Sequence, residues 1–219
     1  MLDLNKIYNL DCMDGMAEFP DNYFELAIVD PPYGSESDAI KTHTSNSKNK
    51  ACKRTKYKQF KNVPPSQKYF KELKRVSINQ IIWGVNFFGH VDLSGGRICW
   101  NKNGTAFGEA ELAFCSCFNS VKTYEFTWNG MIQGDMKNKE SRIHTTQKPV
   151  KLYKWLLHIY AKPGDKILDT HTGSASSIIA CEWMGFDYVG FELDKDYYEA
   201  SLKRLDQERQ KMQQMKMEL

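Results

Sequence analysis

Short apolar runs alternate along the chain with longer stretches in which apolar residues recur at helical spacing. The runs are four to eight residues long, and several of them end at Asp, Asn or Gly. Runs of this length and composition are typical of buried β-strands. We therefore expect strands at residues 7–11, 26–30, 81–84, 97–101, 111–118, 121–128, 166–169 and 187–193.

The strands expected at 111–118 and 121–128 are separated only by Asn119 and Ser120. Two strands joined by so short a polar link are typical of a β-hairpin, in which they pair antiparallel. These two strands are therefore expected to be neighbours in the sheet.

Amphipathic stretches lie between the expected strands. One begins at Ser66, a residue favoured at helix N-termini, and places Tyr69 and Leu73 on one helical face. Another has Pro149 near its first turn, and a third is closed by Gly185. The expected helices are at 13–20, 66–77, 149–161, 176–185 and from 194 into the tail. This order predicts an α/β fold whose mostly parallel sheet is covered by helices on both faces.

The chain has 219 residues, 41% of them hydrophobic and 26% charged, without a repeat or an evident linker. These proportions exclude a disordered or fibrous protein and predict one domain over residues 1–219. No run could span a membrane and no secretory signal is visible, so a cytoplasmic protein without a membrane partner is expected. Six cysteines without CxxC spacing predict reduced thiols and no metal site.

Positive charge is concentrated in one segment. Between Lys41 and Lys61 there are eight basic residues and no acidic one, although the net charge of the chain is only +3. The segment is polar and aperiodic, which predicts a mobile loop over residues 35–65. It is either a solvated insertion or a surface that neutralises nucleic-acid phosphates. The second interpretation gives it the contact residues Lys48, Lys50, Lys53, Arg54, Lys56 and Lys58.

The expected strand at 26–30 leads into the sequence Asp30-Pro31-Pro32-Tyr33. Open α/β sheets bind their ligands at the carboxyl ends of the strands. The two prolines fix the backbone and remove N–H donors, so a carboxylate, a carbonyl and an aromatic ring are presented together. This set suits a planar ring with an exocyclic amine, which would donate to Asp30 and stack on Tyr33. The alternative is a proline-rich turn with a capping Asp.

A second motif follows the strand at 166–169. Residues 169–176 form a loop of small side chains that would let a ligand approach the backbone. The next strand ends at Glu192, which is placed to accept hydrogen bonds from ribose hydroxyls. The first strand ends at Asp11, which could bind an adenine amine. The G-x-G-x-x-G sequence of dinucleotide-binding proteins is absent, which argues against an oxidoreductase.

Together these motifs resemble the DNA amino-methyltransferases, which methylate exocyclic amines with S-adenosylmethionine. Residues 30–33 are similar to their catalytic D-P-P-Y, residues 144–157 to their H-P-T-Q-K-P segment, and residues 169–176 to their D-P-F-x-G-S-G-T loop. The catalytic segment precedes the cofactor loop, as in the circularly permuted β class. The resemblance implies a Rossmann-like methyltransferase fold: a seven-stranded mixed sheet with helices on both faces, its last strand antiparallel through a hairpin.

The resemblance also implies roles for single residues. Asp30, Pro31, Pro32 and Tyr33 are expected to be catalytic. Asp11 would bind the adenine of the cofactor and Glu192 its ribose, while Thr146 and Lys148 would lie near its carboxylate. The full set expected to contact the cofactor is Asp11, Cys12, Asp30, Thr146, Lys148, Asp169, Thr170, Gly173, Ser174, Ala175 and Glu192.

The chain departs from the family pattern at three places. Thr145 stands where the family has Pro, and Thr170-His171 replace Pro-Phe. Ala175 replaces the second Gly of the loop, which suits a tight loop unless that position requires a positive φ.

The resemblance implies a DNA adenine-N6 methyltransferase of a small phage or prophage type, in a setting such as restriction-modification. Cytosine-N4 methylation is the alternative within the class, although its enzymes more often carry Ser in place of Asp30. A non-catalytic nucleic-acid-binding module with the same fold is the alternative outside it. No separate target-recognition domain is evident, so the basic loop and residues 129–142 are left to read double-stranded DNA, and a homodimer stays open.

Overall fold

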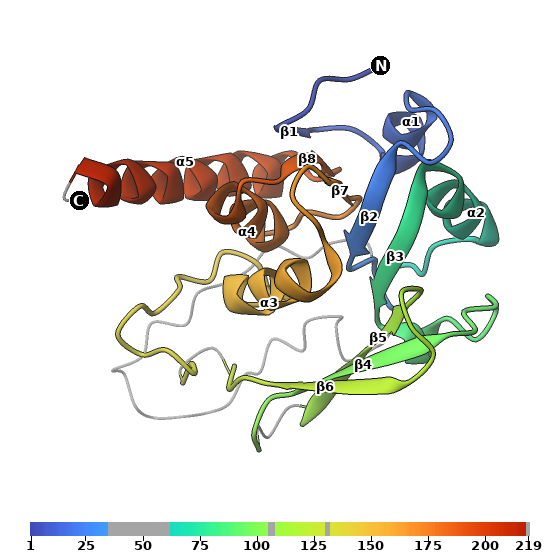
Figure 1. The fold of residues 1–219 in the computed structure, drawn as a ribbon, viewed down its shortest axis with the longest axis horizontal. Coiled ribbons are helices and arrows are strands. Elements are labelled where there is room, and N and C mark those ends of the chain that lie inside the picture. The colour runs from blue at the N-terminus through green and yellow to red at the C-terminus, as the bar shows by residue number, and fades with distance from the viewer. Residues whose placement is uncertain (35–61, 105–107, 130–131, 218–219) are drawn as a thin grey trace, which may run out of the picture.

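The central strands are apolar on both faces, which is why helices cover the sheet on both sides. The computed structural model describes residues 1–34, 62–104, 108–129 and 132–217. Within these residues, eight strands form one sheet in the order β1-β8-β7-β2-β3-β5-β4-β6 (Figure 1). The strands are β1 (Lys6–Tyr8), β2 (Phe24–Val29), β3 (Ser77–Trp83), β4 (Gly96–Asn101), β5 (Ala110–Cys115), β6 (Val121–Glu125), β7 (Lys166–Asp169) and β8 (Asp187–Phe191).

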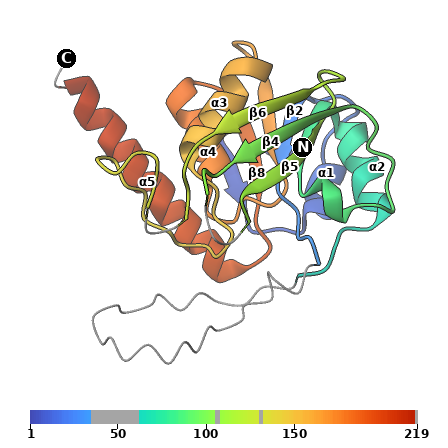
Figure 2. The same cartoon turned by 90° about the horizontal axis from the view of Figure 1, so that it is seen from below.

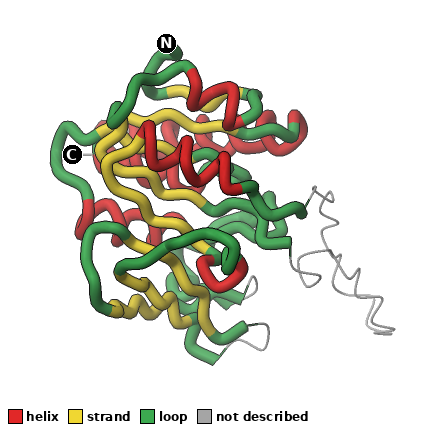
Figure 3. Tube along the Cα trace, turned by 90° about the vertical axis from the view of Figure 1, so that its right-hand side faces the viewer, coloured by secondary structure: helices red, strands yellow, loops and turns green. Residues whose placement is uncertain are grey.

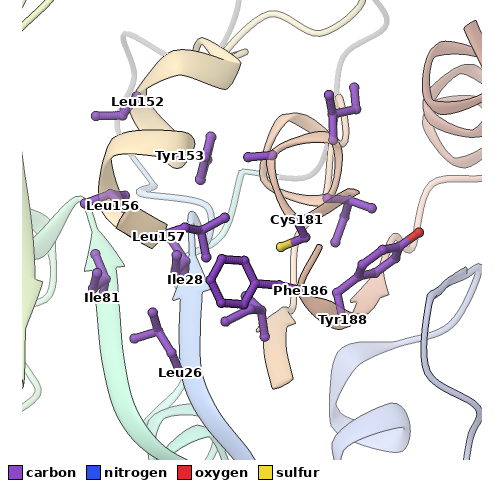
Figure 4. Packing of buried hydrophobic residues seen from close by; sticks show 14 of the residues in the cluster. Leu26, Ile28, Ile81, Leu152, Tyr153, Leu156, Leu157, Cys181, Phe186 and Tyr188 are labelled. Carbon is purple, nitrogen blue, oxygen red and sulfur yellow. The ribbon is translucent and has the colours of Figure 1, made fainter. Parts of the chain in front are cut away.

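Two hydrophobic cores lie on opposite faces of this sheet. In β2, Leu26 and Ile28 belong to one core, and Ala27 and Val29 belong to the other. The first core is covered by α3 (Val150–Tyr160), α4 (Ser176–Met184) and α5 (Lys195–Met217), and the second by α1 (Cys12–Ala17) and α2 (Gln67–Val76) (Figures 2 and 3). Figure 4 shows the first core, where leucines of α3 lie against the strands.

The predicted α/β class, mixed sheet and two helical layers are confirmed, but two details of the sheet are wrong. The sheet has eight strands, one more than the family resemblance implies. The strands β5 and β6 do not form a hairpin either. Instead β4 lies between them, antiparallel to β5 and parallel to β6.

The reason lies in how the chain leaves β5. It crosses the start of β4, where the Arg97 amide donates to the Ser120 carbonyl at 2.9 Å. The crossing needs Gly96, because a Cβ there would lie 2.5 Å from the Phe118 ring. The hairpin instead joins β4 to β5, where Asn101 pairs with Ala110, and Asn103 and Gly104 in the link between them have positive φ.

The predicted helices are all present. Ser66 occupies the N-cap of α2 without a capping side-chain hydrogen bond, and Pro149 occupies that of α3. Gly185 ends α4 in the left-handed conformation, as expected. None of the helices in the described ranges is both long enough and apolar enough to cross a membrane.

The topology determines where a site can form. The strands β1, β8, β7 and β2 are adjacent and mutually parallel, so their carboxyl ends meet at one edge of the sheet. The segments that carry Asp11, Glu192, Asp169 and Asp30 leave the sheet at this edge.

Candidate active site

A pocket of about 570 Å³ opens at the carboxyl ends of these four strands. Most residues predicted to act on or bind a ligand line it: Asp11, Cys12, Asp30, Pro31, Pro32, Tyr33, Thr146, Lys148, Thr170, Gly173, Ser174 and Glu192. Asp169 and Ala175 are buried beside it, with 2% and 0% of their surface exposed, and do not line it. The pocket thus brings together residues that are far apart in the sequence. Asp30 and Lys148, which are in contact, are separated by 118 positions.

Asp30 and Tyr33 are held together where β2 ends. The Tyr33 hydroxyl donates to Asp30 Oδ1. The Tyr33 ring stacks on Phe87, with centroids 5.0 Å apart and planes 11° from parallel. Its edge lies over Gly84, where φ is +76° and a Cβ would approach the ring to 2.1 Å. Gly84 is therefore required both for its conformation and for the space it leaves to Tyr33.

Lys148 lines the pocket, and protein groups hold its ammonium. Its side chain is only 3% exposed, and its Nζ donates to Asp30 Oδ2 at 2.5 Å. The same nitrogen donates to the Tyr33 hydroxyl at 3.2 Å and lies 3.0 Å from Glu111 Oε2. Asp30 and Tyr33 thus accept hydrogen bonds from the ammonium, and Glu111 forms an ion pair with it. The predicted contact of this lysine with a cofactor carboxylate stays a prediction.

Glu111 and Lys102 are members of this cluster that sequence reasoning missed. Lys102 Nζ pairs with Glu111 Oε1, on the opposite side of that carboxylate from the Lys148 contact. Both residues belong to the β4–β5 hairpin. The only signal in the sequence was a glutamate within an apolar strand, and its partner across the chain could not be read from spacing.

The charged groups of this cluster shift one another's pKa values. Burial raises the pKa of Asp30, Glu111 raises it further, and Lys148 opposes both. Burial disfavours the Lys148 ammonium, but Asp30 and Glu111 outweigh it and the net pKa is raised. Burial also disfavours the Glu111 carboxylate, but Lys148 and Lys102 lower its pKa overall. The cluster thus favours a charged lysine between two carboxylates.

The loop after β7 is stabilised by hydrogen bonds from uncharged donors and by its backbone conformation. Asp169 Oδ1 accepts from the His171 amide at 3.0 Å, and Oδ2 accepts from the Ser177 hydroxyl. Burial raises the pKa of Asp169 to about 7, and no cation among the described residues offsets it. Ala175 adopts φ +60° and ψ +25°, so the position does require the left-handed conformation that a glycine would adopt without strain.

Glu192 closes the same loop from β8. Its Oε2 accepts from the Gly173 amide at 2.8 Å and its Oε1 from the Asp194 amide at 2.9 Å. Asp11 is the N-cap of α1, where its side chain accepts from the Met13 amide at 2.8 Å. Burial raises the pKa of the Cys12 thiol to about 12, which argues against a nucleophilic role for it.

Two histidines line the pocket as neutral rings. Burial lowers the pKa of His144 and of His171 to about 4. His171 stands where the family carries Phe, and the Thr170 hydroxyl lies 2.9 Å from its Nδ1. Tyr69 from α2 contacts the same Thr170 hydroxyl at 2.6 Å. Thr170 and His171, which replace the Pro-Phe of the family, therefore form one hydrogen-bonded group with Tyr69.

The remaining predictions concern charges, thiols and metals. Lys48, Lys50, Lys53, Arg54, Lys56 and Lys58 lie outside the described residues. The cysteines within the described ranges, Cys12, Cys99, Cys115, Cys117 and Cys181, are free thiols. In the same ranges, no group of His, Cys, Asp and Glu side chains is arranged to hold a metal ion.

Comparisons with known proteins give similarities to one family. A DNA methylase family whose name covers N6- and N4-acting enzymes matches residues 118–203. A curated relative, the type II methyltransferase M.HinfI of Haemophilus influenzae, is 23% identical over 92% of this chain and 68% of its own length. The chain is therefore similar to DNA methyltransferases of this family, in the matched segment and over most of its length.

Solved structures of DNA methyltransferases share the fold of this chain. The complex of M1.HpyAVI with S-adenosylmethionine has a TM-score of 0.55 at 18% identity and covers 91% of this chain and 98% of that one. The cytosine-N4-specific PvuII DNA methyltransferase has a TM-score of 0.59 at 11% identity, over 90% and 84%. The comparisons therefore support DNA methylation without resolving which base is modified.

Proposed function

We propose that this protein transfers a methyl group from S-adenosylmethionine to the N6 amine of an adenine flipped out of double-stranded DNA. The observation that carries the proposal is the Asp30 carboxylate, fixed beside the Tyr33 ring in the pocket at the end of β2. An ionised carboxylate accepts from an amine more strongly than a neutral hydroxyl does, and Asp30 stands where cytosine-N4 enzymes more often carry Ser.

The pocket fits the cofactor. Its volume of about 570 Å³ lies in the range of small-molecule sites. Glu192 would accept from the ribose hydroxyls and Asp11 from the adenine amine, while Gly173 and Ser174 would let the methionine portion approach the backbone. S-adenosylmethionine, when bound, supplies an electrophilic methyl group.

The chain's own residues would then prepare the target amine. The adenine N6 lone pair is delocalised into the ring, so the amine is a poor nucleophile. Accepting its hydrogen bonds at Asp30 and at the Pro31 carbonyl favours a pyramidal nitrogen and stabilises the positive charge that develops on it. The base would stack on the Tyr33 ring. Phe87 stacks on this ring in the structure, and 42% of the surface of Phe87 is exposed.

The modified base can be identified directly. Plasmid DNA would be incubated with the protein and labelled S-adenosylmethionine, digested, and its methylated nucleosides separated and sequenced in context. We expect N6-methyladenine. N4-methylcytosine would overturn the choice of base, and no methylation of either would favour a non-catalytic DNA-binding module.

Asp30→Ala should abolish the transfer, because it removes the charged acceptor of the amine. We expect the single-turnover rate to fall by about 1,000-fold or more. Thermal unfolding should show that the variant is folded, since Asp30 follows the strand rather than forming part of its core. Full activity in the folded variant would overturn the mechanism.

The basic segment is proposed to contact DNA phosphates. Only its sequence supports this, since residues 35–61 are outside the described ranges. If about four to six of its charges meet phosphates, the logarithm of affinity should fall against that of salt with a slope of about −4 to −5. Alanine at Lys53, Arg54, Lys56 and Lys58 should flatten this slope by several units in a fluorescence anisotropy titration.

A matched control removes the same charge elsewhere. Lys195, Lys203, Lys211 and Lys216 are exposed on α5, and replacing them with Ala makes the same change in net charge. This control should leave the slope within about one unit of the wild-type value. Equal slopes in both quadruple variants would contradict a specific contact and favour a solvated insertion.

A further inference from the structure

The Lys148 ammonium is shared between two carboxylates from different parts of the fold. One is Asp30 at the end of β2, with Nζ to Oδ2 at 2.5 Å, and the other is Glu111 of β5, with Nζ to Oε2 at 3.0 Å. Nearly the whole lysine side chain is buried, with 3% exposed. A buried cation between two anions is fixed more strongly than one in a single ion pair, because each anion restricts its position.

Glu111 is itself fixed. Its Oε1 pairs with Lys102, whose ammonium lies 4.9 Å above the Trp100 ring. Register places Glu111 opposite Trp100 in the β4–β5 pair, so the sheet determines its position. The charges therefore alternate from Asp30 through Lys148 and Glu111 to Lys102, and the four sum to zero.

The aromatic surroundings reinforce this arrangement. The Lys148 nitrogen lies 5.5 Å from the centroid of the Trp83 ring and 5.6 Å from that of the Tyr33 ring. Cation–π attraction favours a charged lysine, whereas burial disfavours it unless carboxylates compensate its desolvation. Removing one of the two carboxylates would leave a long, flexible side chain held by Asp30 alone.

We propose that Glu111 is a positioning residue for catalysis: it holds the Lys148 ammonium against Asp30, and so keeps the amine-accepting carboxylate oriented. This inference rests on the proposed function, because it takes Asp30 as the group that accepts from the substrate amine. Glu111 acts through Lys148 and does not touch the substrate.

Other groups also influence Asp30. Tyr33 donates to it, Tyr153 of α3 and Tyr69 of α2 face it, and Asp169 of β7 is close enough to interact with it electrostatically. Of the groups in contact with Lys148, only Asp30 and Glu111 are anions among the described residues. An effect of Glu111 on the titration of Lys148 is therefore separable from the effects of these neighbours.

The test compares Glu111→Gln with Glu109→Gln. Glu109 precedes the same strand, is exposed, and gives the same change in charge in the same hairpin. We expect Glu111→Gln to lower kcat by about 10- to 100-fold, as displacements near 1 Å do, with the dissociation constants for S-adenosylmethionine and DNA within about twofold of wild type. Glu109→Gln should match wild type.

A pH profile separates positioning from a general structural role. Lys148 loses one of the two carboxylates that keep it protonated, so its pKa falls. The alkaline limb of the single-turnover rate should therefore move down by about one unit or more in Glu111→Gln. Ionisation of DNA bases affects all variants alike, so the comparison with Glu109→Gln removes it.

A double-mutant cycle with Lys148→Gln completes the test. If Glu111 acts through Lys148, Glu111→Gln should cause no further loss of kcat in the Lys148→Gln background. Independent effects, an unmoved alkaline limb or a kcat equal to that of Glu109→Gln would overturn the inference. If wild type methylates DNA and Asp30→Ala does not, such a result overturns only the role of Glu111; inactive wild type would overturn the proposed function.

Discussion

Asp30 and Asp169 stand at the carboxyl ends of neighbouring parallel strands, yet their surroundings differ. Asp30 follows β2 and is paired with the Lys148 ammonium, while Asp169 ends β7 and accepts from an amide and a hydroxyl of the described residues. Burial raises the pKa of both, and for Asp169 it rises to about 7. A buried carboxylate keeps its charge where a cation offsets the loss of water, and otherwise holds its proton into the neutral range.

The difference separates the pocket into two regions. In the region proposed to be catalytic, Asp30, Tyr33 and Lys148 are held, with Glu111 behind them, by charges from distant parts of the chain. In the region proposed to bind the cofactor, the loop 169–176 and Glu192 are held by short-range hydrogen bonds and backbone conformation. Changes in the first should affect rate, and changes in the second should affect affinity and stability.

The largest effect on stability is expected from Asp169→Asn. The folded pKa of Asp169, about 7, is above its ordinary value of 3.8. Its contribution to stability is therefore complete below that ordinary value and is lost as the pH rises toward 7. The free energy of unfolding of the variant relative to wild type should increase by about 2–3 kcal/mol between pH 5 and pH 8.

Urea unfolding at the two pH values measures this change. The contribution of His144 and His171 to stability depends on pH in the opposite direction. Their pKa values are lowered in the folded protein, so this contribution is lost as the pH falls from about 6.5 to about 4. Both proteins contain these histidines, so they cancel in the comparison. A difference independent of pH would show that Asp169 is ionised throughout and resembles Asp30.

Glu192→Ala tests the cofactor region by affinity. Losing hydrogen bonds to a charged group should weaken S-adenosylmethionine binding by about 10- to 100-fold, or about 1.5–3 kcal/mol. Calorimetry would measure the dissociation constant, with Glu199→Ala on the exposed face of α5 as the control. Unchanged affinity would place the ribose elsewhere in the pocket.

Ala175→Gly is expected to have the smallest effect. Gly removes a buried methyl and loosens the unfolded chain, but it relieves a left-handed conformation that costs Ala about 1–2 kcal/mol. Ala180→Gly, in the buried interior of α4, removes the same methyl without that relief. The Ala180 variant should therefore lose at least about 1 kcal/mol more stability in urea unfolding. Equal losses would mean that Ala175 is unstrained.

The sequence by itself determined most of the elements and the edge of the sheet where the site lies. Apolar runs that end in Asp or Glu identified Asp11, Asp30, Asp169 and Glu192, because strand periodicity and turn chemistry are local properties. The left-handed position of Ala175 was foreseeable from the family glycine that it replaces. The order of the motifs also carried the resemblance to the DNA amino-methyltransferases.

Only the tertiary structure decided which charges meet. Strand order is set by competition among pairings across the whole chain, so the local link at Asn119-Ser120 did not reveal that β4 lies between β5 and β6. That placement of the β4–β5 hairpin brings Glu111 to Lys148, a residue the sequence assigned to the cofactor. Ion pairs between distant segments have no periodicity along the chain, because they form only after the sheet has fixed both partners in space.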